Sequence, residues 1–167
     1  MPYLPEGCAR PDIAELEDFW ARAKRQLAGT ELPDEYQVRW IGLDLDTTRQ
    51  VLELIVAGDK TGTFTLPWFV EHTDQPTPAV GDVIILVDFD GHPRLLVKLT
   101  HIEPVPFGEI TAEHTRIDGT PVRDLAVWIP LHTQYWNRML EPLGLRVGAE
   151  MPVWVEKFEL LTPARAR

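Results

Sequence analysis

Apolar residues recur every three or four positions from residue 12 to 28, the spacing that gives a helix one apolar face. Asp12 stands where its side chain can cap this helix, and Glu15 three residues later completes a capping-box pattern. Gly29 follows the last apolar position and is expected to end the helix. The first strong element is therefore an amphipathic helix near the N-terminus.

Two further segments show helical spacing. Residues 47–57 are predicted to form a second helix, with Thr47 and Gln50 again at the spacing of a capping box. Residues 123–140 form the third helical region. Pro130 is expected to kink or split this region, because proline removes one backbone hydrogen bond and clashes with the preceding turn.

The rest of the chain favours strands. Residues 83–89 are almost continuously apolar, as in a buried strand. Asp90-Gly91 is typical of a hairpin turn, so residues 94–102 are predicted to pair back on this strand. Further strands are predicted at residues 36–43, 60–68 and 151–161.

The elements follow one another as helix, strand, helix, strand, hairpin, helix and strand. Because they do not repeat as strict βαβ units, the order indicates an α+β domain around a small, mostly antiparallel β-barrel flanked by helices. Closing the sheet would protect its strand edges. We predict one domain over residues 12–162, preceded by an irregular segment at 1–11 and followed by a tail at 163–167.

Charge narrows the choice of partner. The 167-residue chain has 26 acidic and 16 basic residues, a net charge of −10 at pH 7. Binding to RNA regardless of sequence depends on Lys and Arg side chains that neutralise phosphates, so a chain this acidic is expected to be a poor general RNA binder. An uncharged ligand such as a nucleoside avoids the repulsion.

Several classes of site are absent from the sequence. Cys8 is the only cysteine, so neither an internal disulfide nor a cysteine-based zinc site can form. No apolar run reaches the roughly 20 residues that span a bilayer, and residues 1–12 lack the pattern of a secretory signal. His-Glu-x-x-His, glycine-rich phosphate loops and Gly-x-Ser-x-Gly are missing. We therefore expect a cytoplasmic protein with no metal, no cofactor and no membrane partner.

One segment is similar to a known family. Residues 58–63 read Gly-Asp-Lys-Thr-Gly-Thr between a predicted helix and strand, and residues 80–82 read Val-Gly-Asp before the hairpin. This series resembles the ASCH family, from about Phe19 to Leu161. Further matches, in the order of one ASCH subfamily, are Pro106-Phe107-Gly108-Glu109, Asp118-Gly119, Trp128, His132, Tyr135-Trp136, Met151-Pro152-Val153 and Phe158.

The resemblance implies a PUA-like β-barrel with a pocket for RNA or a nucleoside. Some ASCH proteins resemble amidohydrolases that deacetylate N4-acetylcytidine, at least one resembles a single-strand ribonuclease, and others are proposed as RNA-binding or coactivator modules. By this resemblance Lys60 is the base, Thr63 the nucleophile and Asp118 the proton donor, aligned with a family glutamate. Two positions depart from the pattern: Asp118 is one methylene shorter, and Thr65 stands where the family has an arginine.

The residues themselves permit this chemistry without requiring it. A lysine acts as a general base when burial lowers its pKa towards neutrality, and an amine can activate a threonine hydroxyl as a nucleophile. Residues 60 and 63 converge only if the chain bends between them, which Gly62 allows. The alternatives are a solvent-exposed Lys60 at a helix end, Thr63 as an ordinary strand residue and Asp118-Gly119 as a turn.

Trp40, Trp68 and Thr65 are the candidate substrate-binding residues. Trp68 follows the motif strand, where it can offer a stacking surface for a base, and Trp40 is similar. For both tryptophans the alternative is a large residue of the core. His114 and His132 are further candidates for acid–base roles.

Three functions are compatible with the sequence. The preferred one is an amidohydrolase of an acylated nucleoside, which fits the acidic charge and the retained site residues. The second is a single-strand ribonuclease, which needs cations near its cleft to stabilise charge on the phosphate. The third is a module that binds RNA or a nucleoside without chemistry. The cations available to a ribonuclease are Arg39, Arg94, Lys98, Arg116 and Arg123.

Overall fold

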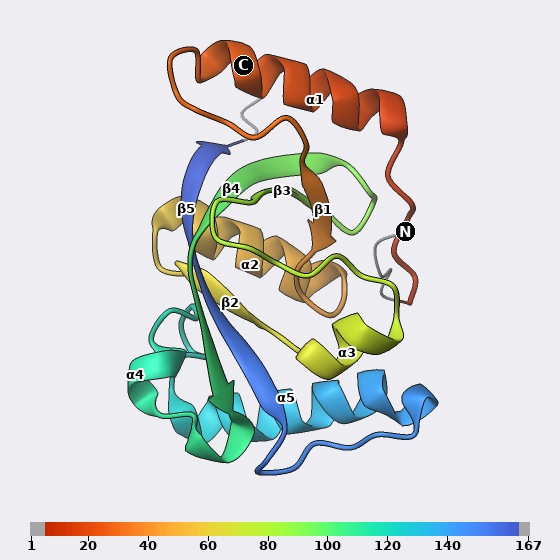
Figure 1. Ribbon diagram of the computed structural model, residues 1–167, viewed down its shortest axis with the longest axis vertical. Helices are drawn as coiled ribbons and strands as arrows, with labels where there is room; N and C mark the ends of the chain where they lie inside the picture. The colour runs from red at the N-terminus through yellow and green to blue at the C-terminus, as the bar shows by residue number, and fades with distance from the viewer. Residues whose placement is uncertain (1–5, 164–167) are drawn as a thin grey trace.

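The computed structural model describes residues 6–163 and shows a five-stranded sheet surrounded by helices (Figure 1). The predicted irregular segment at 1–11 lies partly outside the described residues, and residues 8–11 adopt neither helix nor strand. The predicted tail at 163–167 lies outside them from residue 164 onwards, and residue 163 ends the last strand.

The sheet has the strand order β1-β3-β4-β5-β2, so β1 and β2 are its two edges. β1 pairs with β3 in parallel, and the other three pairs are antiparallel. Two register shifts along the long β4–β5 pair mark points where the strands can bend, and the sheet curves into a half-barrel. The predicted α+β class with a mostly antiparallel sheet flanked by helices is confirmed. The strands are β1 (Gln37–Trp40), β2 (Gly62–Thr65), β3 (Val83–Val87), β4 (Pro93–Pro106) and β5 (Pro152–Pro163).

Helices cover both faces and both ends of this sheet. Helices α1 and α5 lie at opposite ends of the molecule, and α2 packs behind the sheet between them (Figure 1). The α-helices are α1 (Ile13–Gln26), α2 (Leu45–Ala57), α3 (Pro67–His72), α4 (Ala112–Thr115) and α5 (Leu125–Leu140), and two 3-10 turns follow β4 and α5, namely η1 (Phe107–Glu109) and η2 (Glu141–Leu143).

Strand β3 is buried on both faces, which explains its unbroken apolar sequence. Val83 and Ile85 belong to one cluster with the apolar face of α1. Ile84 and Leu86 point the other way, because side chains alternate along a strand, and they belong to a second cluster with α2. Strand β3 therefore holds α1 against one of its faces and α2 against the other.

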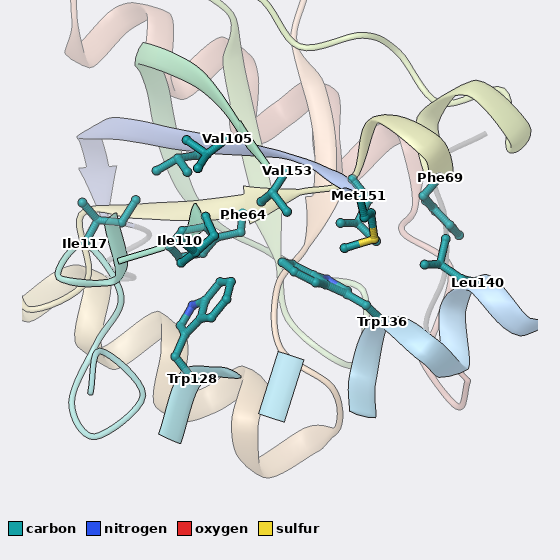
Figure 2. Packing of buried hydrophobic residues seen from close by; sticks show 12 residues of the cluster. Phe64, Phe69, Val105, Ile110, Ile117, Trp128, Trp136, Leu140, Met151 and Val153 are labelled. Atoms are coloured by element: carbon teal, nitrogen blue, oxygen red, sulfur yellow. The ribbon is translucent and has the colours of Figure 1, made fainter. Parts of the chain in front are cut away.

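A third cluster fills the other end of the sheet and supports α5 (Figure 2). Trp128 and Trp136 project from α5 towards β2 and the start of β5, with Trp128 fully buried. The two indole rings meet edge to face, with centroids 5.5 Å apart. Phe64 of β2 packs on Trp128 at 4.8 Å, so the same cluster fixes α5 against strand β2.

Two helix starts differ from the predicted pattern. Asp12 caps α1 by accepting the Glu15 N–H at 3.0 Å, but the Glu15 carboxylate pairs with the His92 ring instead of closing a capping box. Helix α2 begins earlier than predicted, because Asp44 and not Thr47 is its cap. Asp44 accepts the Thr47 N–H at 2.8 Å and the Thr47 hydroxyl accepts the Asp44 N–H at 3.0 Å, which satisfies two donors of the helix end.

Pro130 neither ends nor splits α5, which runs without interruption from Leu125 to Leu140. The proline lies on the exposed side of the helix, within its first two turns. There water can satisfy the carbonyl of Ala126, whose helical partner the proline removes. The buried tryptophans on the opposite side keep the helix on the sheet.

Candidate active site

A cavity of about 330 Å3 opens between the two edge strands of the half-barrel. We call the gap between β1 and β2 the seam. The cavity walls come from both edge strands, from α2, α3 and α5, and from the loop at Asp118. The predicted site residues that line it are Lys60, Thr63, Asp118, Trp40 and Thr65.

Trp68 is placed differently from the other candidates. It was expected on a strand beside the pocket, but β2 ends at Thr65 and Pro67 begins helix α3. Trp68 is therefore turned to pack on the cluster around α5, and it does not line the cavity. The walls near α3 and α5 are instead formed by Phe69 and Tyr135.

Lys60 is buried and paired with Asp118. Its side chain is 4% exposed, and Nζ lies 2.6 Å from Asp118 Oδ1. Helix α2 ends at Gly58 in a left-handed conformation, and the Lys60 N–H then donates to the Leu54 carbonyl at 3.1 Å. This turn brings the lysine inwards, which excludes a solvent-exposed Lys60 at the helix end.

The residues on either side of Lys60 are tied to the loop that carries Asp118. The Asp59 carboxylate accepts the Thr120 N–H at 2.9 Å, and this hydrogen bond holds the pKa of Asp59 below its usual value. The Thr61 N–H donates to the Ile117 carbonyl at 2.9 Å. Because both flanks are fixed, the ion pair is positioned by backbone contacts before any ligand binds.

Gly62 lets β2 come close to its neighbours. A Cβ atom at this position would collide with the Glu156 carbonyl and would lie 2.6 Å from Ile117 Cδ1. Its backbone is extended, so the glycine serves close packing and not a left-handed bend. Thr63 follows on the same strand with a half-buried side chain that lines the cavity, and among residues 6–163 its hydroxyl has no hydrogen-bond partner.

His132 of α5 faces the same carboxylate from the opposite wall. Its Nε2 lies 3.9 Å from Asp118 Oδ2, and its side chain is 14% exposed. Burial lowers the pKa of His132 to about 4, because its effect is larger than the opposite effect of the nearby Asp118 carboxylate, which raises the pKa. From the sequence, this histidine was only one of two candidates for an acid–base role, because its distance from Asp118 along the chain does not indicate that the two side chains meet.

A second buried ion pair crosses the seam and was missed by the sequence analysis. Glu156 of β5 is fully buried, and its carboxylate accepts from Arg39 of β1 at 2.8 Å and from the Thr65 hydroxyl at 2.9 Å. The available signal was a glutamate two positions before Phe158, on the same face of a strand with apolar residues on both faces. A charged residue there needs a buried partner.

The cations that a ribonuclease would need are mostly engaged elsewhere. Of the five candidates, Arg39 lines the cavity, and it is held by Glu156. Arg116 pairs with Glu113 at 3.2 Å on the surface. Arg123 pairs with Asp59 at 3.3 Å. Arg94 and Lys98 do not line the cavity.

The described part of the chain offers neither a metal cluster nor a helix suited to a membrane. Within residues 6–163, no three His, Cys, Asp or Glu side chains gather closely enough to hold a metal ion. No helix of this region combines the length and apolar character that crossing a bilayer requires.

Comparison with known families identifies the domain. A model of the ASCH domain matches residues 39–162. The chain belongs to the ASCH family. Its PUA-like fold is an RNA-binding fold, and the matched range contains every predicted site residue of this ASCH domain. A search of curated proteins found none that matches the sequence.

Solved structures share the fold of this ASCH domain. The crystal structure of an ASCH domain from Lactobacillus crispatus JV V101 is 18% identical, with a TM-score of 0.74 over 89% of this chain and 92% of that one. A protein from Enterococcus faecalis V583, described by a family of unknown function, is 21% identical, with a TM-score of 0.77 over 90% and 92% of the two chains. At these identities the likeness establishes the fold alone.

The missing family arginine at position 65 has a counterpart in this ASCH domain. Thr65 and Arg39 bind the same carboxylate, Glu156, from the two edge strands. A guanidinium group is therefore present in this part of the cavity, but strand β1 supplies it instead of β2.

Proposed function

We propose that this ASCH domain is an amidohydrolase that removes the acyl group from an acylated cytidine of the N4-acetylcytidine type. The observation that carries the proposal is the buried 2.6 Å contact between Lys60 Nζ and Asp118 Oδ1, with Thr63 on the wall of the same cavity. The three groups supply a base, a proton donor and a hydroxyl nucleophile, the set that acyl transfer needs.

The first half-reaction moves two protons and exchanges one bond. It starts from the form of the pair in which the shared proton resides on Asp118, so that Lys60 is a neutral amine. Lys60 takes the hydroxyl proton of Thr63 while Thr63 Oγ1 attacks the acyl carbonyl carbon. The carbon–nitrogen bond breaks, and Asp118 gives its proton to the leaving nitrogen. The result is free cytidine, an acyl ester on Thr63, a Lys60 ammonium and an Asp118 carboxylate.

The cavity suits an uncharged ligand with an aromatic ring. Its volume of about 330 Å3 is at the lower end of the range for small-molecule sites. The Lys60–Asp118 pair at one end and the Arg39–Glu156 pair at the other each balance their own charge. Aromatic walls at Trp40, Tyr135 and Trp136 provide stacking surfaces for a base.

Cleavage of single-stranded RNA fits these contacts less well. A ribonuclease without a metal needs uncommitted cations at the phosphate, whereas Arg39 and Lys60 both face carboxylates. Binding of RNA without chemistry would fit the RNA-binding fold of the family, and the experiment below separates it from hydrolysis.

The test incubates the purified protein with N4-acetylcytidine, its longer acyl homologues and a short single-stranded RNA, followed by chromatography. Lys60→Met removes the amine and keeps the apolar length of the buried side chain. Lys157→Met, at an exposed position of β5, is the matched control.

We expect release of cytidine by the unmodified protein and by Lys157→Met, and loss of release in Lys60→Met. Cleavage of the RNA in place of deacylation would establish the nuclease and contradict the proposal. Binding of N4-acetylcytidine or RNA with no product would also contradict it, and would leave a binding module.

A further inference from the structure

The proton on His132 can be placed from its neighbours. Its Nδ1 lies 2.9 Å from the Trp128 carbonyl oxygen, one turn earlier in α5. A carbonyl oxygen only accepts hydrogen bonds, so Nδ1 carries the hydrogen and donates it. In the neutral ring the other nitrogen, Nε2, then has a free lone pair, and this atom is the one that faces Asp118.

Aromatic rings hold His132 in this orientation and keep it neutral. The imidazole stacks on Trp128 with ring centroids 4.1 Å apart and planes 19° apart. Phe64 and Trp136 meet it edge to face at 5.9 and 4.9 Å. Of the charged groups that act on the ring, Asp118 raises its pKa and Lys60 lowers it, and burial among the aromatic rings outweighs the effect of Asp118. At neutral pH, Nε2 is therefore an acceptor.

His132 Nε2 and Asp118 Oδ2 lie close enough together for one small donor beside them to reach both. Their separation of 3.9 Å is too long for a direct hydrogen bond. When Asp118 is a carboxylate, both atoms are acceptors, and a water molecule that donates one hydrogen to each would bridge them. Both residues line the cavity that also contains Thr63, so a water there lies on the path to an ester on Thr63.

We propose that His132 is the base that activates this water and hydrolyses the acyl ester on Thr63. The inference rests on the proposed function and assigns its second half-reaction, for which Lys60 is in the wrong state. After the first half-reaction Lys60 is already protonated and paired with Asp118 Oδ1, so the acceptors left for the proton of water are Asp118 Oδ2 and His132 Nε2. His132 Nε2 is the neutral acceptor that the cavity provides beside Asp118.

The atoms of this step balance. The water oxygen attacks the ester carbonyl carbon as one water proton passes to His132 Nε2. The bond between the carbonyl carbon and Thr63 Oγ1 breaks, and Lys60 returns its proton to Oγ1. The free acid leaves, and His132 passes its proton to Asp118 through the next water that bridges the 3.9 Å separation. Lys60 is then neutral and Asp118 protonated, the state from which the first half-reaction starts.

The decisive experiment traps the ester. His132→Asn keeps an amide N–H near the Trp128 carbonyl and removes the atom that faces Asp118. His132→Phe is a second variant that keeps a stacked ring, and His101→Gln, at an exposed position, is the matched control. Each protein is mixed with N4-acetylcytidine in single-turnover and multiple-turnover experiments, and its intact mass is measured.

We expect His132→Asn and His132→Phe to release about one equivalent of cytidine quickly and then to slow by about 100-fold or more, the usual contribution of a general base. Their mass should rise by one acetyl group, and Thr63→Ala in the same background should abolish the added mass. His101→Gln should behave like the unmodified protein.

The outcomes separate the two proposals. Turnover by the unmodified protein with undiminished multiple turnover in both His132 variants overturns the inference and leaves the proposed function standing. A fall in both the first and later turnovers without added mass also overturns it, because His132 would then act before the ester forms. No turnover by the unmodified protein overturns the proposed function and this inference with it.

Discussion

Two buried carboxylates, Asp118 and Glu156, define the polar interior of this small domain. Each has one cation within 2.8 Å, supplied by Lys60 or Arg39. Buried pairs of this kind add little net stability, because desolvation offsets the attraction, but removal of one partner leaves an unpaired charge in the interior. The two pairs should therefore respond sharply to single substitutions.

We predict that Arg39→Met lowers the free energy of unfolding by about 3 kcal/mol, because Glu156 then keeps only the Thr65 hydroxyl as a side-chain donor. Arg39→Met combined with Glu156→Gln should recover most of the loss, since the buried charge is gone. Urea unfolding of the two variants and the parent measures both effects. Equal stability of the single and double variants would contradict the pairing.

The burial of His132 predicts a pH dependence of stability. Its pKa is about 4 in the folded protein, below the ordinary 6.5, so between these values the unfolded chain binds a proton that the folded protein does not. The free energy of unfolding should therefore fall by about 3 kcal/mol as the pH is lowered from 6.5 to 4. His132→Phe should lack this contribution.

Urea unfolding at pH 7 and pH 4.5 compares the parent with His132→Phe, and groups common to both proteins cancel in the difference. Parallel losses of stability in the two proteins would show that His132 keeps its ordinary pKa in the folded state.

Only some of the residues of the candidate site could be predicted from the sequence. Lys60, Thr63 and Asp118 lie in a short motif and a turn that resemble the family, and the structure brings all three to one cavity. Glu156 lies in no such motif, and its importance comes from Arg39, 117 positions earlier in the chain. Such a pairing depends on the strand order, which a single sequence does not reveal.

At the scale of elements, the sequence predicted those helices, turns and strands whose formation depends mainly on residues close together in the chain. The α1 and α2 stripes, the Asp90-Gly91 turn and the apolar β3 were all predicted correctly within a few residues. Trp68 was misplaced because a strand-like composition continues into Pro67, and proline is as well suited to the first turn of a helix. The predicted split at Pro130 was wrong, because the effect of a proline inside a helix depends on whether water reaches the carbonyl that it leaves without a partner.

The close packing of β2 gives a prediction for Gly62→Ala. The added Cβ collides with the backbone of β5 and with Ile117, so the β2–β5 pairing must shift, and we expect a loss of at least about 2 kcal/mol of stability. Gly148→Ala is the control, because a Cβ added there would have no other atom within 4 Å and the φ of Gly148 is not positive. Thermal unfolding of both variants provides the comparison, and similar melting temperatures would refute the argument.

At the scale of the whole molecule, the net charge of −10 and the pairing of the cavity cations both disfavour the binding of a phosphate backbone. We predict that N4-acetylcytidine binds to Thr63→Ala, which keeps both ion pairs and lacks the proposed nucleophile, with a dissociation constant that does not change with salt. Binding of single-stranded RNA would instead weaken with salt, with a logarithmic slope of about −0.7 for each phosphate contacted. Titrations at low and high potassium chloride distinguish the two, and a steep slope for the nucleoside would contradict a neutral site.

The seam has a practical consequence. Its walls belong to parts of the chain as distant as Trp40 and His132, which meet there without a strand-to-strand ladder between β1 and β2. Any occupant adds contacts that the unfolded chain cannot make, so by mass action a ligand at 100 times its dissociation constant raises the unfolding free energy by about 2.7 kcal/mol. The melting temperature therefore reports whether the cavity is occupied, even when the ligand is not hydrolysed. A collection of modified nucleosides can be ranked by the rise in melting temperature that each one causes.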